Sequence, residues 1–176
     1  MVENEKDKII FEWYEKYGEA IFKYIFIMIQ DYQQAEDLTN DTFLKAFIHL
    51  DTFKRDASEK TWLYRIAHNL TVDMIRKKKP VILLKEAFLF NKDKNPLPEE
   101  MLQIREQSLE IYKALSTLKS TYREIIILRK LKEFSIEETA GILGWSEAKV
   151  KSTLFRAMKA LEKELKKEGE LNGKII

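Results

Sequence analysis

Residues that form tight turns are scarce in this chain, which has 5 glycines and 3 prolines among its 176 residues. Few positions can therefore reverse the backbone sharply, and apolar residues recur at helical spacing through most of the sequence. Apolar residues make up 45% of the chain, which is enough for packed cores, and the length suits one domain or two small ones. The sequence thus predicts an all-α fold.

The stretch from Phe53 to Pro80, FKRDASEKTWLYRIAHNLTVDMIRKKKP, combines a polar loop with an amphipathic helix that is predicted to end at Pro80. Its core face is marked by Leu63, Ile66, Ala67, Leu70 and Met74. A second face gathers Trp62, Arg65, Asn69, Asp73 and Arg76. An aromatic ring, an amide and cations together are typical of a platform for a nucleic-acid strand, although a solvated face that includes a tryptophan fits equally well.

The preceding helix, predicted over 33–50, begins after Asp31, which can cap it, with Gln34 at the reach-back position of a capping box. Its buried face carries Phe43, Ala46, Phe47 and Leu50, and another face carries Asp37, Asn40, Asp41 and Leu44. By residue type alone, this second stripe is more typical of a solvated face than of a docking surface for a basic protein.

Residues 81–107 show a weaker pattern. VILLKEAFLF is apolar and fits a short helix or a segment that packs on a partner, and NKDKNPLPEE is typical of a linker. We therefore predict two small helical domains, 1–79 and 108–176, joined by a linker over 80–107. The second domain is expected to begin with one helix that carries Leu109, Tyr112, Leu115 and Leu118, and another that carries Tyr122, Ile125, Ile126, Leu128 and Arg129.

Two capped helices joined by a glycine turn follow. Ser135 caps the first, Glu138 completes a capping box, Gly144 supplies a turn with positive φ, and Ser146 caps the second. The expected buried residues are Ile136, Ala140 and Leu143, then Val150, Leu154, Ala157 and Leu161. This pattern predicts a helix-turn-helix, whose second helix enters the major groove of DNA.

The face of the second helix opposite Val150 is cationic and carries Glu147, Lys149, Lys151, Ser152, Phe155, Arg156 and Lys159. Lysine and arginine donate to guanine, serine donates or accepts, and phenylalanine meets the thymine methyl group. Residues 108–176 hold 14 Lys and Arg against 10 Asp and Glu, whereas residues 1–79 hold 13 against 14. A helix-turn-helix can also serve only protein interaction, but the cationic face favours DNA.

Several classes of function are disfavoured. Cysteine is absent, which excludes disulfides and thiolate metal sites and is compatible with a cytoplasmic location. The run Ile21 to Ile29 is too short for a membrane span and is predicted to be a buried helix, so we expect no membrane insertion. His49 and His68 show no zinc-site spacing, and no phosphate-binding loop is present. We expect no enzyme activity, cofactor or metal.

Three segments, AEDLTNDTFLKAF, KTWLYRIAHNLTVDMIRKK and LGWSEAKVKSTLFRA, together resemble the bacterial RNA polymerase sigma factors of the sigma-70 family, in its extracytoplasmic-function (ECF) group. They stand in the family's order, and the resemblance covers about Phe11 to Leu165. It implies that residues 1–79 correspond to sigma region 2 and residues 108–176 to sigma region 4.

The resemblance also implies site residues. The core-polymerase-binding positions are Asp37, Leu38, Asn40 and Asp41, where the family commonly has Gln-Glu in place of the last two. The loop Asp51–Lys60 is expected to capture a flipped base of the minus-ten element, with Lys60, Trp62, Tyr64, Arg65, Asn69, Arg76 and Lys77 on the adjoining DNA. The minus-thirty-five contacts are Lys149, Lys151, Ser152, Phe155 and Arg156. The chain departs from common family residues at Ala148, Thr153 and Met158.

The implied partners are core RNA polymerase, promoter DNA as duplex and as single-stranded non-template strand, and an anti-sigma factor. An alternative is a stand-alone helix-turn-helix transcriptional regulator that binds duplex operators, with residues 1–79 for sensing or dimerisation. A more remote alternative is a subunit that binds only proteins.

Overall fold

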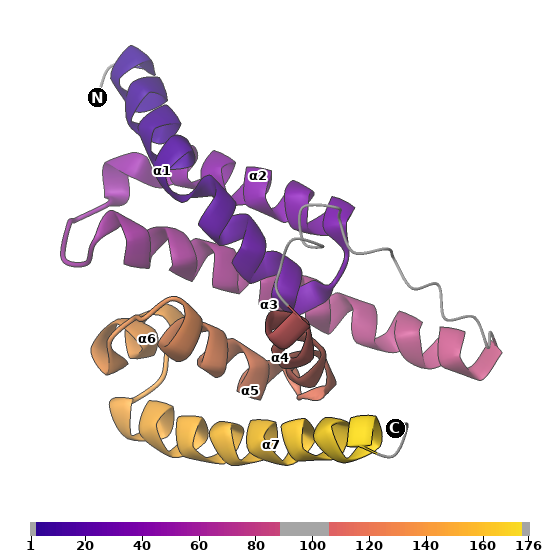
Figure 1. The fold of residues 1–176 in the computed structure, drawn as a ribbon. Coiled ribbons are helices and arrows are strands. Elements are labelled where there is room, and N and C mark those ends of the chain that lie inside the picture. Colours follow the sequence, from indigo (N-terminus) through magenta and orange to yellow (C-terminus); the bar gives the residue numbers. More distant parts are fainter. Residues whose placement is uncertain (1–2, 89–105, 174–176) are drawn as a thin grey trace. The chain divides into compact units, whose positions relative to one another are not determined.

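The computed structural model describes residues 3–88 and 106–173, and the regular elements in these ranges are all helical (Figure 1), as the sequence predicts. The chain divides into two compact units, Met1–Pro96 and Leu97–Ile176. Most of the predicted linker, residues 89–105, lies outside the described residues. Neither described range contains a helix that is long and apolar enough to cross a membrane.

Within residues 3–88, the first unit has three long helices and a short turn: α1 (Glu3–Ile29), α2 (Tyr32–His49), the 3-10 turn η1 (Leu50–Thr52) and α3 (Glu59–Phe88). The predicted cap of α2 is confirmed, because Asp31 Oδ1 accepts a hydrogen bond from Gln34 N at 3.0 Å. The predicted reach-back is wrong: the buried Oε1 atom of Gln34 has no hydrogen-bond partner within the described part of the chain.

The core of this unit lies where the three helices meet. Its fully or nearly fully buried side chains are Ile21, Tyr24, Ile25 and Met28 from α1, Ala35, Phe43 and Ala46 from α2, and Leu63, Tyr64 and Ala67 from α3. The predicted burial of the run Ile21 to Ile29 is confirmed in the main. On α3 the buried face is rotated from the expected one, because Ile66, Leu70 and Met74 are only half-buried.

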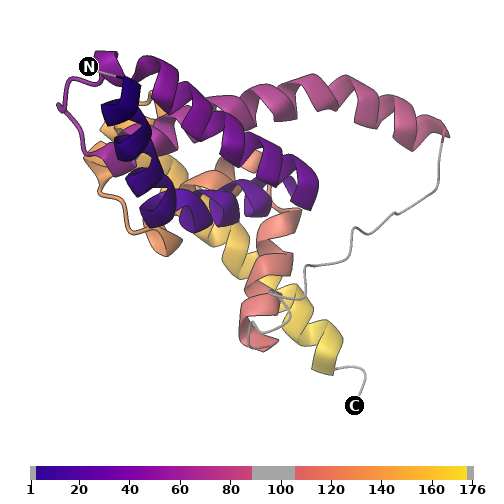
Figure 2. The same cartoon turned by 90° about the horizontal axis from the view of Figure 1, so that it is seen from above.

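The helix α3 does not end at Pro80, so that prediction was wrong. It continues to Phe88 and projects beyond α1 and α2 (Figures 1 and 2). A proline removes one backbone donor, but its fixed φ is helical, so a helix can pass through a proline at the cost of a hydrogen bond. The apolar run after Pro80 therefore begins as an extension of α3.

The second unit contains α4 (Glu106–Thr117), α5 (Ser120–Ile126), a π-helical turn η3 (Ile127–Leu131), α6 (Ile136–Leu143) and α7 (Glu147–Gly173). The helix predicted to carry Tyr122 to Arg129 is thus a short α-helix that widens into a π turn. The core of the second unit is formed by Ala114, Leu115, Leu118, Ile125, Ile126, Ile127, Leu128, Phe134, Ile142, Val150 and Ala157. This core fixes α7 along its inner face and leaves the outer face to solvent.

Candidate nucleic-acid interface

The helix-turn-helix in the second unit has the local geometry that its sequence predicts. Ser135 Oγ accepts from Glu138 N at 3.0 Å, and Ser135 N donates to Glu138 Oε2 at 2.7 Å, which completes the capping box. Gly144 ends α6 in the left-handed region, with φ of 66°. Ser146 Oγ then accepts from Lys149 N at 3.2 Å at the start of α7. These caps fix where α7 begins.

The inner face of α6 differs from the predicted one. Thr139, Ile142 and Leu143 are buried, whereas Ile136 and Ala140 are only half-buried. A threonine can be buried here because its Oγ1 donates to the Ser135 carbonyl oxygen at 2.7 Å, which satisfies its polar atom. On α7 the expected burial is found at Val150, Ala157 and Leu161, while Leu154 is half-buried and Thr153 is buried.

The outer face of α7 exposes all five residues that were assigned to minus-thirty-five DNA: Lys149, Lys151, Ser152, Phe155 and Arg156. Phe155 is 63% exposed, with Lys159 Nζ at 4.5 Å from its ring centre. Lys149 Nζ lies 4.2 Å from the ring centre of Trp145, a residue that the sequence analysis did not single out. Its position directly after Gly144, at the entry to α7, is the signal that could have found it.

In the first unit, four of the residues assigned to minus-ten DNA are exposed along α3: Arg65, Asn69, Arg76 and Lys77. Lys60 and Trp62 are half-buried at its start. The assignment of Tyr64 to the DNA surface needs correction, because its side chain is fully buried and its hydroxyl donates to the Ala20 carbonyl oxygen at 3.2 Å. Burial also raises the pKa of Tyr64. Tyr64 therefore holds α3 against α1 and is not part of a DNA-contacting face.

Trp62 belongs to an aromatic cluster with Trp13 of α1 and Phe53. The ring centres of Trp62 and Phe53 lie 4.9 Å apart, and Trp13 meets both rings edge-on at 6.0 and 5.7 Å. Trp62 also lines an open hollow of about 330 Å³, together with Lys45, His49, Thr52, Arg65, Ile66 and Asn69. The ring is thus part core and part surface, beside cationic side chains.

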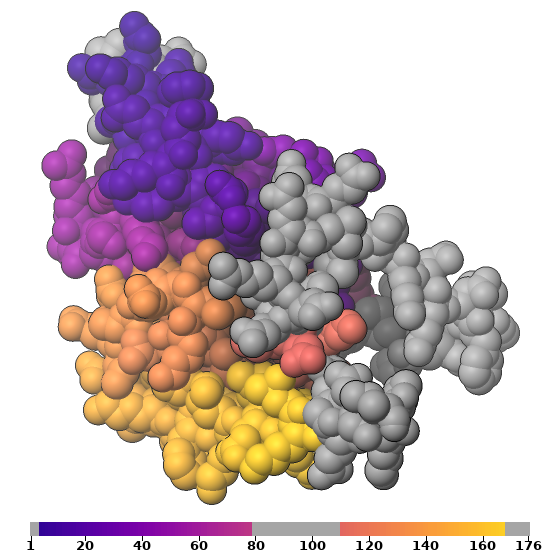
Figure 3. Space-filling view, in the orientation of Figure 1, coloured from indigo at the N-terminus to yellow at the C-terminus, as the bar shows by residue number. Residues whose placement is uncertain are grey.

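A larger hollow of about 600 Å³ is lined by Trp13 and Phe53 of the same cluster. One wall comes from α1 and the other from the segment that joins α2 to α3, and the lining residues are Ile9, Glu12, Trp13, Leu50, Phe53, Arg55, Asp56, Ala57, Ser58 and Glu59. Residues 54–58 are exposed, and Arg55 has a left-handed backbone with φ of 59°. Figure 3 shows this joining segment at the molecular surface next to α1.

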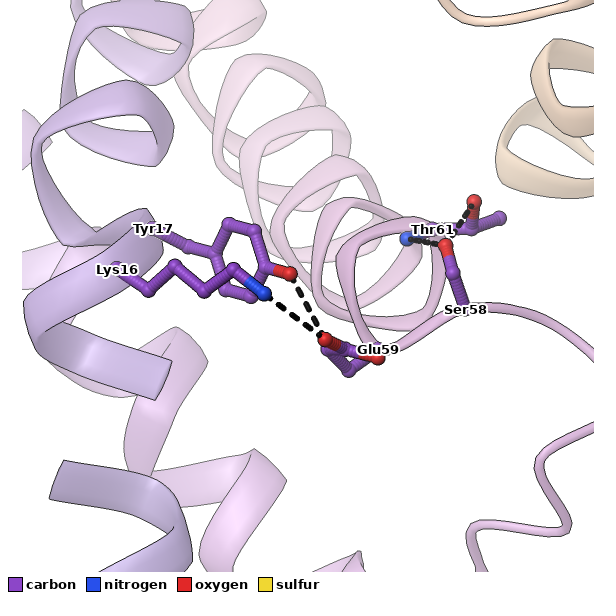
Figure 4. A network of polar contacts seen from close by, with 5 residues as sticks. All are labelled: Lys16, Tyr17, Ser58, Glu59 and Thr61. Carbon is purple, nitrogen blue, oxygen red and sulfur yellow. Dashed lines mark hydrogen bonds and ion pairs between the residues drawn. The ribbon is translucent and has the colours of Figure 1, made fainter. Parts of the chain in front are cut away.

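Polar contacts connect α1 to both ends of that segment. Lys6 forms an ion pair with Asp51, and at the other end Tyr17 Oη donates to Glu59 Oε1 at 2.9 Å, with Lys16 Nζ 3.3 Å from the same oxygen (Figure 4). The Glu59 backbone N–H and the Tyr17 hydroxyl hold the pKa of Glu59 below its usual range. Ser58 Oγ accepts from Thr61 N at 3.1 Å, so the start of α3 is capped as well.

The acidic stripe on α2 is exposed at Asp37, Asn40 and Asp41, and Leu44 beside it is 57% exposed. The assignment of Leu38 to this exposed stripe needs correction, because Leu38 is only 5% exposed and is part of the core, like Ala35. At about 100° per residue, Leu38 lies at the edge of the stripe, roughly 100° from Asp37 and 60° from Asp41, and its side chain is on the side that packs into the core. No group of three metal-ligating side chains is found within residues 3–88 and 106–173.

Two family models match the chain, one described as sigma-70 region 2 over residues 13–81 and one as sigma-70, region 4 over residues 108–161. The ECF RNA polymerase sigma factor SigX of Bacillus subtilis (strain 168) is 34% identical over 160 residues, 86% of this chain and 81% of that protein. RNA polymerase sigma factor YlaC of the same organism is 35% identical over 159 residues, 89% and 92% of the two chains. Among solved structures, sigma factor RpoE from Bartonella quintana, in complex with the anti-sigma factor NepR, has a TM-score of 0.72 at 27% identity and covers 90% of this chain and 98% of that chain.

Proposed function

This chain belongs to the ECF group of the sigma-70 family of RNA polymerase sigma factors, and we propose that it directs core RNA polymerase to specific promoters and opens the minus-ten element. We assign polymerase binding and minus-ten melting to residues 1–79 and minus-thirty-five recognition to residues 108–176, with residues 80–107 as the connection. The role is stoichiometric rather than catalytic, since the polymerase performs the chemistry, and it is exercised in the cytoplasm.

The observation that carries the strand-opening part is the hollow between α1 and the segment 51–59. A base that leaves a duplex loses its stacking, at a cost of a few kcal/mol, and needs a pocket that holds it. The hollow is of the size of ligand sites and has a polar rim at Arg55, Asp56 and Ser58. A regulator that reads only duplex operators has no use for such a pocket.

The adjoining DNA would lie along α3. Arg65, Arg76 and Lys77 are exposed cations on this helix and would hold phosphate groups, with Lys60 at the helix start. Asn69 supplies an amide that can meet a base edge, and the partly exposed ring of Trp62 offers a stacking surface. Tyr64 has no place in this surface, because it is buried.

The minus-thirty-five duplex would receive the outer face of α7. Lys151, Ser152, Phe155 and Arg156 are exposed at successive positions of this face and would meet base edges. Lys149, which lies over the Trp145 ring at the entry to the helix, would contact phosphate. Thr153 departs from a common family arginine but is buried, so the departures that change the exposed face of α7 are those at Ala148 and Met158.

Core polymerase would dock on the acidic stripe of α2, through Asp37, Asn40 and Asp41. Leu38 contributes from the core, by holding α2 in place. An anti-sigma factor is a further partner that this group of proteins leads us to expect, as in the complex of the Bartonella quintana protein with NepR.

A transcription experiment tests the proposal. The purified chain is mixed with core RNA polymerase and a genomic DNA library, and run-off transcripts are sequenced. We expect transcripts that begin at a small set of start sites and share two upstream elements. In gel shifts, the chain alone should bind these promoters weakly, whereas the chain with core polymerase should bind strongly and open the strands. Strong duplex binding by the chain alone would favour the stand-alone regulator instead.

A further inference from the structure

We propose that one face of α1 is a positioning element for the base-capturing segment, and that Lys6, Trp13 and Tyr17 set the shape of the minus-ten pocket. The inference rests on the proposed function and deepens it, because it assigns promoter selectivity to α1 side chains, two of which, Lys6 and Tyr17, need not touch DNA. These three residues are spaced seven and four apart, so they share one side of the helix. We call them the α1 positioning face.

The contacts of this face are made at three places along the segment between α2 and α3. Lys6 pairs with Asp51 where the segment begins, and Tyr17 donates to Glu59 at 2.9 Å where it ends. Between them, Trp13 packs edge-on against Phe53 at 5.7 Å. Each contact joins residues at least 40 positions apart in the sequence, so they form only when α1 and the segment are correctly packed.

The segment itself is exposed and contains a strained residue. Residues 54–58 are all exposed, and Arg55 has a left-handed backbone that a residue with a Cβ atom adopts at a cost. An exposed segment of this kind samples several shapes unless its ends are held. The ion pair at Asp51 and the hydrogen bond at Glu59 hold those two ends, and the Lys6 side chain is only 17% exposed in its pair.

The pocket shares a wall with the same face. Trp13 lines the hollow together with Ile9 and Glu12, opposite Arg55 and Asp56 of the segment. A shift of the segment relative to α1 would therefore change the width of the hollow directly. Tyr17 acts through Glu59, and Lys6 through Asp51, so both are positioning residues rather than contacts to the base.

The test uses the holoenzyme, formed from the full chain and core polymerase, and a pool of single-stranded DNA with a randomised central window. Bound DNA is sequenced, and the enrichment of one base at each window position is measured. The variants are Tyr17→Phe, which removes one hydroxyl, and Lys6→Met, which removes one charge. Their matched controls on the same helix are Tyr14→Phe, whose ring packs against Phe43, and the exposed Lys8→Met.

We expect Tyr17→Phe and Lys6→Met each to reduce the enrichment at one window position by about three- to tenfold. In these two variants, assembly with core polymerase and affinity for duplex minus-thirty-five DNA should stay at the wild-type level. Both control variants should keep the wild-type enrichment as well. A charge swap provides a second readout: Lys6→Glu should lose the enrichment, and Lys6→Glu with Asp51→Lys should regain most of it.

The inference is overturned, while the proposed function stands, by wild-type enrichment in Tyr17→Phe and Lys6→Met or by a charge swap that regains nothing. Equal losses in duplex binding, polymerase assembly and thermal stability also overturn it, because they indicate general destabilisation. If the wild-type holoenzyme itself enriches no base and starts no RNA chain, the proposed function fails and this inference falls with it. The wild-type control thus separates the two failures.

Discussion

Arg123 Nε lies 2.9 Å from the carbonyl oxygen of Leu115 and donates a hydrogen bond to it from eight residues further along the chain. The Nη2 atom of the same guanidinium donates to the Ser116 and Leu118 carbonyl oxygens at 2.7 and 3.0 Å. The last carbonyl groups of a helix have no partner within the helix, and a cation there is also attracted to the negative end of the helix dipole. Arg123 therefore caps α4 and joins it to α5.

The first prediction concerns this cap. Arg123→Ala should lower the free energy of unfolding by about 3 kcal/mol, since three carbonyl groups lose a charged donor in a largely buried site. Arg123→Lys should recover less than half of that loss, because an ammonium group lacks the planar fork that reaches several acceptors at once. Urea unfolding followed by circular dichroism measures both. Lys113→Ala, at an exposed position of α4, is the control, and an equal effect of the two alanine variants would refute the cap.

The second prediction concerns pH. The pKa of Glu59 is lowered in the folded chain by its own backbone N–H and by the Tyr17 hydroxyl. A carboxyl group with a depressed folded pKa stabilises the fold above its unfolded pKa, and that contribution is lost as the pH falls through the folded value. Glu59→Gln should therefore be less stable than the wild type at neutral pH.

The difference between the two proteins should shrink as the pH falls below the ordinary glutamate value of about 4.3. Urea unfolding of both proteins at neutral pH and at acid pH checks this. A stability difference that is the same at both pH values would contradict the assignment, because a contact that depends on size or packing does not titrate.

Local signals were enough to predict the helix-turn-helix. The capping box of Ser135 and Glu138, the glycine in the turn and the cap at Ser146 each depend on residues within four positions of one another. Exposure of the α7 face follows from helical spacing once the buried residues Val150 and Ala157 are recognised. Such features are fixed by the chain's neighbours in sequence, and sequence reasoning captures them well.

Features that depend on packing between helices were not predictable. Tyr64 is chemically suited to a DNA surface or to a core, and only the position of Ala20 on α1 decides that it is buried. The same is true of the Tyr17–Glu59 contact, which joins residues 42 positions apart. Leu38 was assigned by a motif that runs continuously along the sequence, whereas a helix turns each successive residue to a different face.

A third prediction tests the docking stripe. Asp37→Lys with Asp41→Lys should abolish association with core polymerase, because it reverses the charge of an exposed face that is proposed to meet a basic partner. Circular dichroism should show an unchanged fold, since both side chains are exposed. A pull-down of core polymerase measures the loss. Glu15→Lys with Glu19→Lys makes the same change of charge on α1, and it should retain binding; capture of core polymerase by the α2 variant would disprove the docking site.

A fourth prediction tests the outer face of α7. Lys151→Ala with Arg156→Ala should weaken the binding of the holoenzyme to minus-thirty-five duplex by about 10- to 100-fold, which corresponds to one or two contacts to bases. The two side chains are exposed, so stability should be unchanged. Titration of a labelled promoter duplex measures the affinity. Lys163→Ala with Lys166→Ala removes the same charge further along α7 and should have a much smaller effect, and equal losses in the two variants would indicate non-specific attraction only.

The fifth prediction compares two glycines near the same turn. Gly144 has φ of 66°, and a Cβ atom built there meets no atom within 4 Å, so the objection to a side chain is the backbone conformation alone. Gly141 lies within α6, and a Cβ atom there also meets nothing within 4 Å.

Gly144→Ala should therefore lower the free energy of unfolding by about 1 kcal/mol, through strain in the left-handed region. Gly141→Ala should raise it by about 0.5 to 1 kcal/mol, because alanine restricts the unfolded chain and favours the helix. Urea unfolding of the two variants measures both changes, and the same substitution three residues apart should change the free energy of unfolding in opposite directions. A gain in stability for Gly144→Ala would show that the turn does not require the left-handed conformation.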